Sequence, residues 1–188
     1  MYPSTLTGSA VTLKWNSVKG ADQYVIYGAK CGSKMKQIGV VDSRTLSQKI
    51  TGIKGDDLKK DTFYKFYVAA LANGSHHKSV LLAVTSTIHE ILKGSGKYAN
   101  YTSIRLHSAK SIKLKKGKKT TIKAEQVTSS GAGTHAPVHR KVHYLSSNPK
   151  VAKVGKTSGK VTAVSAGTCK IYCFTQNGRY KTVSVKVR

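Results

Sequence analysis

The residues most suited to chemistry in this sequence are lysines crowded into one short stretch. Six of the eleven residues from 113 to 123 are lysines: Lys113, Lys115, Lys116, Lys118, Lys119 and Lys123. Alternation with apolar residues predicts that the first two point away from a core, and Gly117 predicts a turn that carries the next ones. Such a surface attracts polyanions, with an affinity that falls steeply as salt rises. Alternatively, the lysines keep the chain soluble and blunt an exposed sheet edge.

The charge of the whole chain is strongly positive and unevenly distributed. The 188 residues hold 33 Lys and Arg against 7 Asp and Glu, a formal charge of +26. Residues 96–188 hold 20 basic residues and one acid, a charge of +19, whereas residues 1–95 hold 13 and 6, a charge of +7. This asymmetry predicts two units with different surfaces.

Nucleic-acid binding is the common interpretation of so basic a chain. Direct recognition, however, uses a groove-reading helix or aromatic rings ordered among the basic side chains. Nothing in the sequence orders the four candidate tyrosines into such a platform: Tyr98, Tyr101, Tyr172 and Tyr180. Nucleic acid is therefore the less favoured partner.

No group of residues has the spacing of a catalytic or metal site. His139 and His143 are four apart, but the second lies in a predicted strand rather than on a zinc-binding helix. Asp56 and Asp57 stand among lysines, which favours a solvated loop. No paired carboxylates suit glycoside hydrolysis, and no serine stands in a nucleophile elbow. We therefore expect neither enzymatic activity, nor a metal site, nor a cofactor.

The cysteines do not define a disulfide pattern. There are three, so they cannot all pair within the chain. Cys169 and Cys173 lie four apart in a stretch that alternates as a strand does, which separates them by about 13 Å and excludes a bond between them. Both share a face with Ile171, so we expect them to pack in a core.

Apolar residues alternate with a period of two through most of the chain, which predicts strands that would position these side chains. In the first half, strands are predicted over residues 11–15, 23–27, 64–70 and 79–85, with turn residues between them. Trp15 is at an inward position and is the expected core anchor. Strands at this spacing predict a β-sandwich.

Three motifs in this half resemble the fibronectin type III domain. They are Leu13-Lys14-Trp15, Gly20-Ala21-Asp22-Gln23-Tyr24, and Leu58 six residues before the strand that starts at Tyr64. The last is the pattern of a tyrosine corner, and the resemblance implies that the Tyr64 hydroxyl bonds nearby backbone. Lys60 stands where the family usually has Pro. The Arg-Gly-Asp loop of the family's integrin-binding members is missing, so that mechanism is not implied.

The second half continues the alternation. Strands are predicted over residues 111–115, 121–124, 141–145, 151–154, 160–164, 168–175 and 180–187. Between the last two, Asn177-Gly178 predicts a two-residue hairpin, because both residues tolerate positive φ.

This half resembles the bacterial immunoglobulin-like domain of group 2, the Big-2 domain of intimin and invasin type. The resemblance rests on residues 146–154 and 158–168. Tyr144 stands where the family usually has Trp. The family usually has Ala at the two cysteine positions, which agrees with a core location. The resemblance implies a tandem module of bacterial surface or wall-associated proteins, as in surface proteins of Gram-positive gut bacteria.

These observations predict an all-β chain of two tandem immunoglobulin-like β-sandwich domains. We expect a fibronectin type III-like domain over residues 1–95, a linker over 96–102 and a Big-2 domain over 103–188. No apolar run reaches the ~18–20 residues of a membrane span, and Met1 is not followed by signal-peptide features. The chain is therefore either intracellular or a piece of a longer secreted chain. The two family resemblances favour the second, so we expect a monomeric fragment that lacks its signal peptide, located outside the cell at its surface or wall.

The predicted function is that of a non-catalytic spacer or adhesion module of a bacterial surface or secreted protein. Its basic second domain would bind an anionic polymer or glycan, such as teichoic acid or a sulfated or sialylated glycan. Two alternatives stay open. One is an accessory domain pair of a larger glycan- or wall-active enzyme, and the other is nucleic-acid binding.

Overall fold

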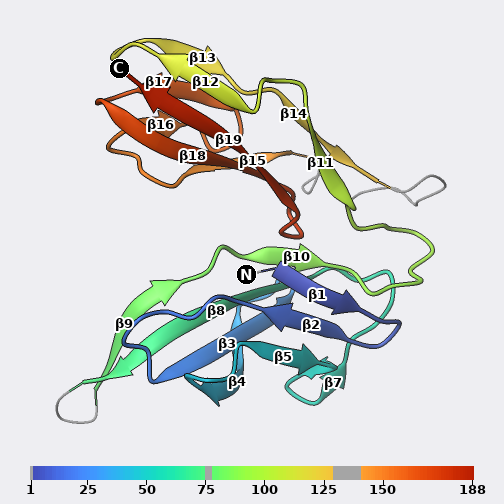
Figure 1. Cartoon of the computed structure of the whole chain (residues 1–188). Helices are drawn as coiled ribbons and strands as arrows, with labels where there is room; N and C mark the ends of the chain where they lie inside the picture. Colours follow the sequence, from blue (N-terminus) through green and yellow to red (C-terminus); the bar gives the residue numbers. More distant parts are fainter. Residues whose placement is uncertain (1, 75–77, 129–140) are drawn as a thin grey trace. The chain divides into compact units, whose positions relative to one another are not determined.

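The computed structural model describes residues 2–74, 78–128 and 141–188. Every regular element in those ranges is a β-strand, which confirms the predicted all-β class (Figure 1). The chain divides into two compact units, Met1–Asn100 and Tyr101–Arg188. Among the described residues, no helix has the length and apolar character that crossing a membrane requires.

The first unit packs two main sheets. Its strands are β1 (Tyr2–Leu6), β2 (Val11–Lys14), β3 (Gln23–Lys30), β4 (Lys36–Asp42), β5 (Ser47–Ile50), β6 (Gly52–Ile53), β7 (Asp56–Asp57), β8 (Tyr64–Asn73), β9 (Ser79–Val84) and β10 (Ile88–Glu90). One sheet has the order β1-β2-β5, and the other has the order β10-β8-β3-β4, with β9 also paired to β8. β6 and β7 form a short hairpin of their own.

Alternate residues of these strands point between the two sheets and fill the core. Trp15 is only 4% exposed, and its ring packs edge to face on Tyr24 with 5.7 Å between centroids. The buried Tyr24 hydroxyl accepts a hydrogen bond from the backbone N–H of Val18 at 2.9 Å. Trp15 is therefore the core anchor that the sequence predicted.

The predicted tyrosine corner is present in the first unit. The Tyr64 hydroxyl accepts a hydrogen bond from Lys59 N at 2.9 Å, while Leu58 is buried beside it in the core. This bond satisfies a polar group that would otherwise be buried without a partner. The strand order and the corner together make the first unit a fibronectin type III-like sandwich.

The second unit is also built from packed sheets. Its strands are β11 (Ser103–Leu106), β12 (Ser111–Leu114), β13 (Lys119–Thr121), β14 (Ala124–Val127), β15 (His143–Ser146), β16 (Ala152–Val154), β17 (Lys160–Ala163), β18 (Gly167–Phe174) and β19 (Tyr180–Val187). The largest sheet has the order β12-β19-β18-β15, a second has the order β13-β17-β16, and β11 pairs with β14. β12 runs parallel to β19, whereas the other pairings are antiparallel.

The core of the second unit confirms the expected place of two cysteines. Cys169 and Cys173 are buried on the inward face of β18 with Ile171 between them, and both thiols are free. Tyr144 packs in the same core. It leaves so little room beside Gly159 that a Cβ there would lie 3.0 Å from the Tyr144 ring.

The hairpin between β18 and β19 differs from the two-residue turn predicted at Asn177-Gly178. Phe174 pairs with Tyr180, so the loop between them is five residues long. Asn177 is buried in it: its Oδ1 accepts a hydrogen bond from Thr175 Oγ1 at 2.7 Å, and its Nδ2 donates to Tyr101 O at 2.9 Å. These two hydrogen bonds of the Asn177 side chain stabilise the longer loop. In a two-residue turn the same side chain would face solvent.

Candidate polyanion-binding surface

The predicted site lysines occupy four places in the second unit. Lys113 lies on β12, Lys115, Lys116 and Lys118 lie on the following turn, Lys119 begins β13, and Lys123 follows that strand. All six side chains are exposed. Since β12 and β13 belong to different sheets, the structure does not gather these lysines on one face.

The turn between β12 and β13 is fixed by backbone hydrogen bonds to other strands. Lys116 N donates to Arg188 O at 3.0 Å, and Gly117 N donates to Ala163 O at 3.0 Å. Gly117 has a φ of 79°, which favours glycine because it lacks a Cβ. The turn lysines are therefore presented from a well-anchored backbone where β17 and β19 end.

On the largest sheet, Lys113 joins lysines that are distant in the sequence. The parallel pairing of β12 with β19 sets Lys113 beside Lys186, and β18 places Lys170 beside Ser184 of β19. All three lysines are exposed because the alternate positions, such as Val185, face the core. Lys170 and Lys186 were not among the predicted site residues, since the register between strands is not visible in the sequence.

Aromatic side chains occupy the other half of the same sheet face. The rings of Tyr172 and Tyr180 meet edge to face with 5.7 Å between centroids, and Phe174 lies 5.8 Å from His143. Burial lowers the pKa of His143, and its Nε2 is hydrogen-bonded to the Gln176 amide. Tyr172 and Tyr180 are therefore neighbours on this face, but their planes lie at 61° to each other and form no parallel stacking platform.

The positive charge of the second unit is almost uncompensated. Residues 101–188 hold 19 Lys and Arg and the single acid Glu125. Glu125 Oε1 accepts a hydrogen bond from Arg105 Nη1 at 2.7 Å, and its Oε2 lies 3.3 Å from His107 Nε2. Every Lys and Arg that the structure describes in this unit has an exposed side chain. The unit thus carries the field that long-range attraction of a polyanion requires.

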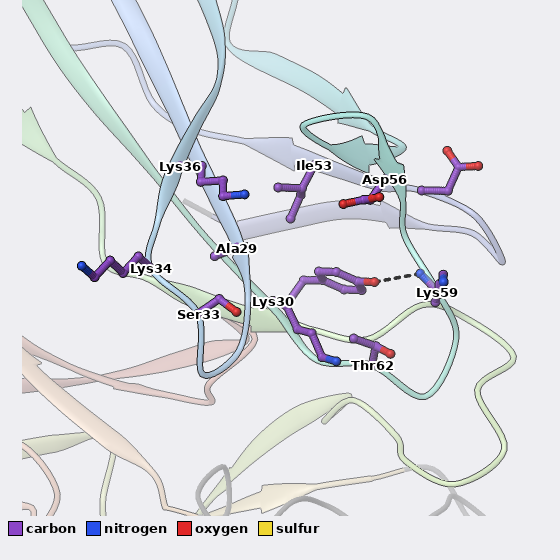
Figure 2. Close-up of a pocket in the computed structure, with 11 residues that line it drawn as sticks. Ala29, Lys30, Ser33, Lys34, Lys36, Ile53, Asp56, Lys59 and Thr62 are labelled. Carbon is purple, nitrogen blue, oxygen red and sulfur yellow. Dashed lines mark hydrogen bonds between the residues drawn. The ribbon is translucent and has the colours of Figure 1, made fainter.

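The first unit has an open groove of a different character, with a volume of about 410 Å³ (Figure 2). Lys30, Lys34, Lys36 and Lys59 line it together with the exposed carboxylates Asp56 and Asp57. These two carboxylates offset half of the lysine charge. The groove is therefore less suited to a polyanion than the surface of the second unit.

A cysteine and a histidine that are far apart in the sequence meet in the first unit. Cys31 Sγ lies 3.2 Å from His89 Nδ1. This pair resembles a nucleophile and its base, but burial raises the pKa of the Cys31 thiol to about 11, partly offset by the Lys65 charge. A thiol with so high a pKa is a poor nucleophile at neutral pH, because the thiolate is the reactive form.

No metal centre emerges within residues 2–74, 78–128 and 141–188. These ranges contain no group of three or more His, Cys, Asp or Glu side chains that could hold an ion. His143 lies on strand β15, as predicted. Its candidate partner His139 lies outside the described residues.

Sheets packed face to face in each unit define the chain as a tandem of immunoglobulin-like β-sandwiches. Residues 102–187 match the family model described as the bacterial Ig-like domain (group 2). The second unit is a domain of that family, as its motifs indicated. Domains of this family occur in bacterial surface proteins and are generally non-catalytic.

No curated protein sequence matches this chain. Three of the solved structures that are similar to it each have a TM-score of 0.35. A C-terminal 282-residue fragment of intimin, in complex with the intimin-binding domain of the translocated intimin receptor, has 14% identity, with 97% of this chain and 61% of that chain covered. The FN1–FN3 domains of chicken CNTN1 have 12% identity, with 98% and 64% covered. A two-domain fibronectin type III segment of chicken tenascin has 15% identity, with 97% and 93% covered. The chain thus spans less than two thirds of the first two.

Proposed function

We propose that this chain is a non-catalytic extracellular module of a bacterial surface or secreted protein, which spaces its neighbours and attaches them to anionic polymer. One observation carries the proposal: the exposed and almost uncompensated positive charge of residues 101–188. Such a surface raises the local concentration of polyanions and their rate of association. Teichoic acids and sulfated or sialylated glycans are negatively charged polymers found outside bacterial cells.

The spacer role is supported by the connection between the proposed domains, residues 96–102. Its first part is bonded to the first unit, where Asp61 Oδ1 accepts a hydrogen bond from Lys97 N at 2.7 Å. The Asn100 side chain then accepts from Ile91 N at 3.2 Å and donates to Ile91 O at 2.7 Å. Bonds of this kind limit fraying of a connecting segment.

The second part of the connection is bonded to the second unit. Tyr101 O accepts from the buried amide of Asn177, and Thr102 N donates to Val127 O at 2.8 Å. Each end of the connection is therefore held by its own domain. A segment whose two ends are each hydrogen-bonded to a folded domain has less conformational freedom than an unbonded linker of the same length.

Attachment is tested by passing the whole chain over immobilised heparin and over uncharged dextran. We expect retention on heparin at low salt, loss of that retention as salt approaches the physiological range, and no retention on dextran. Elution that does not depend on salt, or passage through heparin at low salt, would contradict the proposal.

A pair of variants locates the charge that matters in this assay. Both remove three exposed lysines: one carries Lys115→Ser, Lys116→Ser and Lys118→Ser, and its control carries Lys14→Ser, Lys34→Ser and Lys49→Ser in the first unit. We expect the first variant to elute from heparin at lower salt than its control. Earlier elution of the control would place the attraction in the first unit instead.

The spacer role is tested by tryptic cleavage after Lys97. Asp61→Ala removes the acceptor of the Lys97 N–H, so we expect faster cleavage there than in the parent chain. Asp57→Ala changes charge equally at an exposed position of the same unit and serves as the control. Rapid cleavage after Lys97 in the unaltered chain would show that the connection frays without the substitution.

A further inference from the structure

The outer face of the sheet β12-β19-β18-β15 is organised in rows that run across the strands. From the basic end to the aromatic end, the rows are Lys113, Lys186 and Thr168; then Ser111, Ser184 and Lys170; then Thr182, Tyr172 and Leu145; then Tyr180, Phe174 and His143. The intervening residues Cys169, Ile171 and Cys173 on β18, and Val183 and Val185 on β19, are buried in the core, whereas Lys181 is exposed. The side chains in the rows therefore face outward.

This face combines three kinds of group and contains no carboxylate. Lysines and hydroxyls fill two rows, aromatic and aliphatic groups fill most of the other two, and the four strands hold no Asp or Glu. Three row steps along a strand cover about 20 Å, and four strands cover about 14 Å across. The face is long enough to contact several units of a polymer.

The apolar half of the face remains open to solvent. Tyr180 is 56% exposed and Leu145 is 52% exposed. Contacts across the strands, such as Tyr172 with Tyr180, stabilise the sheet. They still leave apolar surface in water, and covering that surface with a ligand is favourable.

We propose that this face binds an acidic polysaccharide, whose sugar rings pack on Tyr172, Tyr180 and Leu145 while its acid groups meet Lys113, Lys170 and Lys186. This inference rests on the proposed function of polyanion attachment and names the ligand class and the site. The proposed binding site is therefore this sheet face, and the turn lysines Lys115, Lys116 and Lys118 lie next to it rather than at its centre.

The chemistry of the face matches that of an acidic sugar. A sugar ring has an apolar C–H face, which packs on aromatic and aliphatic side chains, and aromatic rings present negative π faces to such hydrogens. Its hydroxyls require polar partners, which Thr182 and Ser184 offer on the neighbouring strand. Carboxylate or sulfate groups on the sugar require cations, and the lysine rows supply them.

Two other polyanions fit the face less well. The planes of the Tyr172 and Tyr180 rings lie at 61° to each other, so they do not form the parallel platform on which successive bases stack. A polyphosphate has no ring, so it gains nothing from the aromatic rows. Both polymers are therefore controls for the sugar.

The test compares a tyrosine variant of the whole chain with a matched control. The variant carries Tyr172→Ser and Tyr180→Ser, and the control carries Tyr27→Ser and Tyr67→Ser in the first unit, where those rings stack at 4.6 Å. Affinities for heparin, polyphosphate and oligo-dT are measured by competition at low salt. Tyr180→Ser alone is the second variant, because its exposed ring can be removed with little effect on folding.

We expect the double variant to lose about tenfold in heparin affinity, the scale of one stacking contact, and to keep its polyphosphate affinity. Tyr180→Ser should lose less on heparin, and the control should lose nothing. Equal losses on heparin and polyphosphate, or a tyrosine-dependent preference for oligo-dT, would overturn the inference and leave polyanion attachment in place. If the unaltered chain binds none of the three polymers, the proposed function itself is overturned.

Discussion

Removing the three lysines of the outer sheet face should change how strongly binding depends on salt. The variant carries Lys113→Ser, Lys170→Ser and Lys186→Ser, which lie on β12, β18 and β19. Its matched control carries Lys119→Ser, Lys153→Ser and Lys160→Ser on the outer side of β13, β16 and β17. Both triples consist of exposed lysines and remove three positive charges, so the two variants differ only in which face loses them.

The expected magnitude follows from counterion release. Each lysine that neutralises a charge on a flexible polyanion contributes about −0.7 to the slope of log affinity against log salt, so three contribute about −2. Between about 50 mM and 200 mM NaCl, the affinity of the unaltered chain should fall roughly 20-fold more than that of the sheet-face variant. The control should keep most of the steep dependence.

Fluorescence anisotropy of a labelled heparin oligosaccharide, titrated with each protein at the two salt concentrations, measures this slope. Circular dichroism and a thermal melt establish that all three proteins are folded. Equal changes of slope in the two triple variants would refute the reasoning, because net charge alone would then account for binding.

Three further predictions concern the scaffold and its thiol. Tyr64→Phe should lower the free energy of unfolding of the first unit by about 1–3 kcal/mol, since it leaves the Lys59 N–H without its acceptor, and a denaturant titration measures this. Gly159→Ala should cost at least about 1–3 kcal/mol in the second unit, because φ is +66° there and the added Cβ would lie 2.3 Å from Ile122 O; an unchanged melting temperature would contradict the geometry. Cys31 should react slowly with iodoacetamide at pH 8 and faster as pH rises toward its pKa of about 11, because burial stabilises the neutral thiol up to that pH; a rate that levels off near pH 8.5 would contradict this.

Local sequence patterns were enough to predict the tyrosine corner and the core positions of the strands. The tyrosine corner needs only a Leu and a Tyr at a fixed spacing, and the structure forms the bond from Lys59 N that the pattern implies. The core positions of Trp15 and Cys173 follow from alternation within a single strand. Features of this kind depend on the spacing of residues within one short segment, which can be read from the sequence.

The aromatic half of the outer sheet face could not be predicted, because it depends on register. A two-residue turn at Asn177-Gly178 would pair Tyr172 with Val183. The side chains of β19 that now face outward would then face the core. The five-residue loop instead pairs Tyr172 with Thr182, which leaves Tyr180 beside Phe174 on the outer face. A shift of one residue moves every side chain of a strand to the other face, so this loop decides whether the surface exists.

The contact between Cys31 and His89 could not be predicted either, for a different reason. The two residues are 58 positions apart. They meet only because β3, which ends just before Cys31, and β10, which contains His89, both pair with β8. The same holds for Lys186 beside Lys113, which requires β12 to run parallel to the last strand. Sheet order is a property of the whole domain, and no motif of this sequence encodes it locally.

The most direct test of the account is a backbone amide NMR titration of the whole chain with a heparin oligosaccharide at low salt. We predict that the largest shifts occur on β18 and β19, at Lys170, Tyr172 and Tyr180, with smaller shifts at the turn lysines. Three results would contradict a defined binding face on the sheet β12-β19-β18-β15. They are largest shifts in the first unit, largest shifts on β13 and β17 of the second unit, and shifts spread evenly over all exposed lysines.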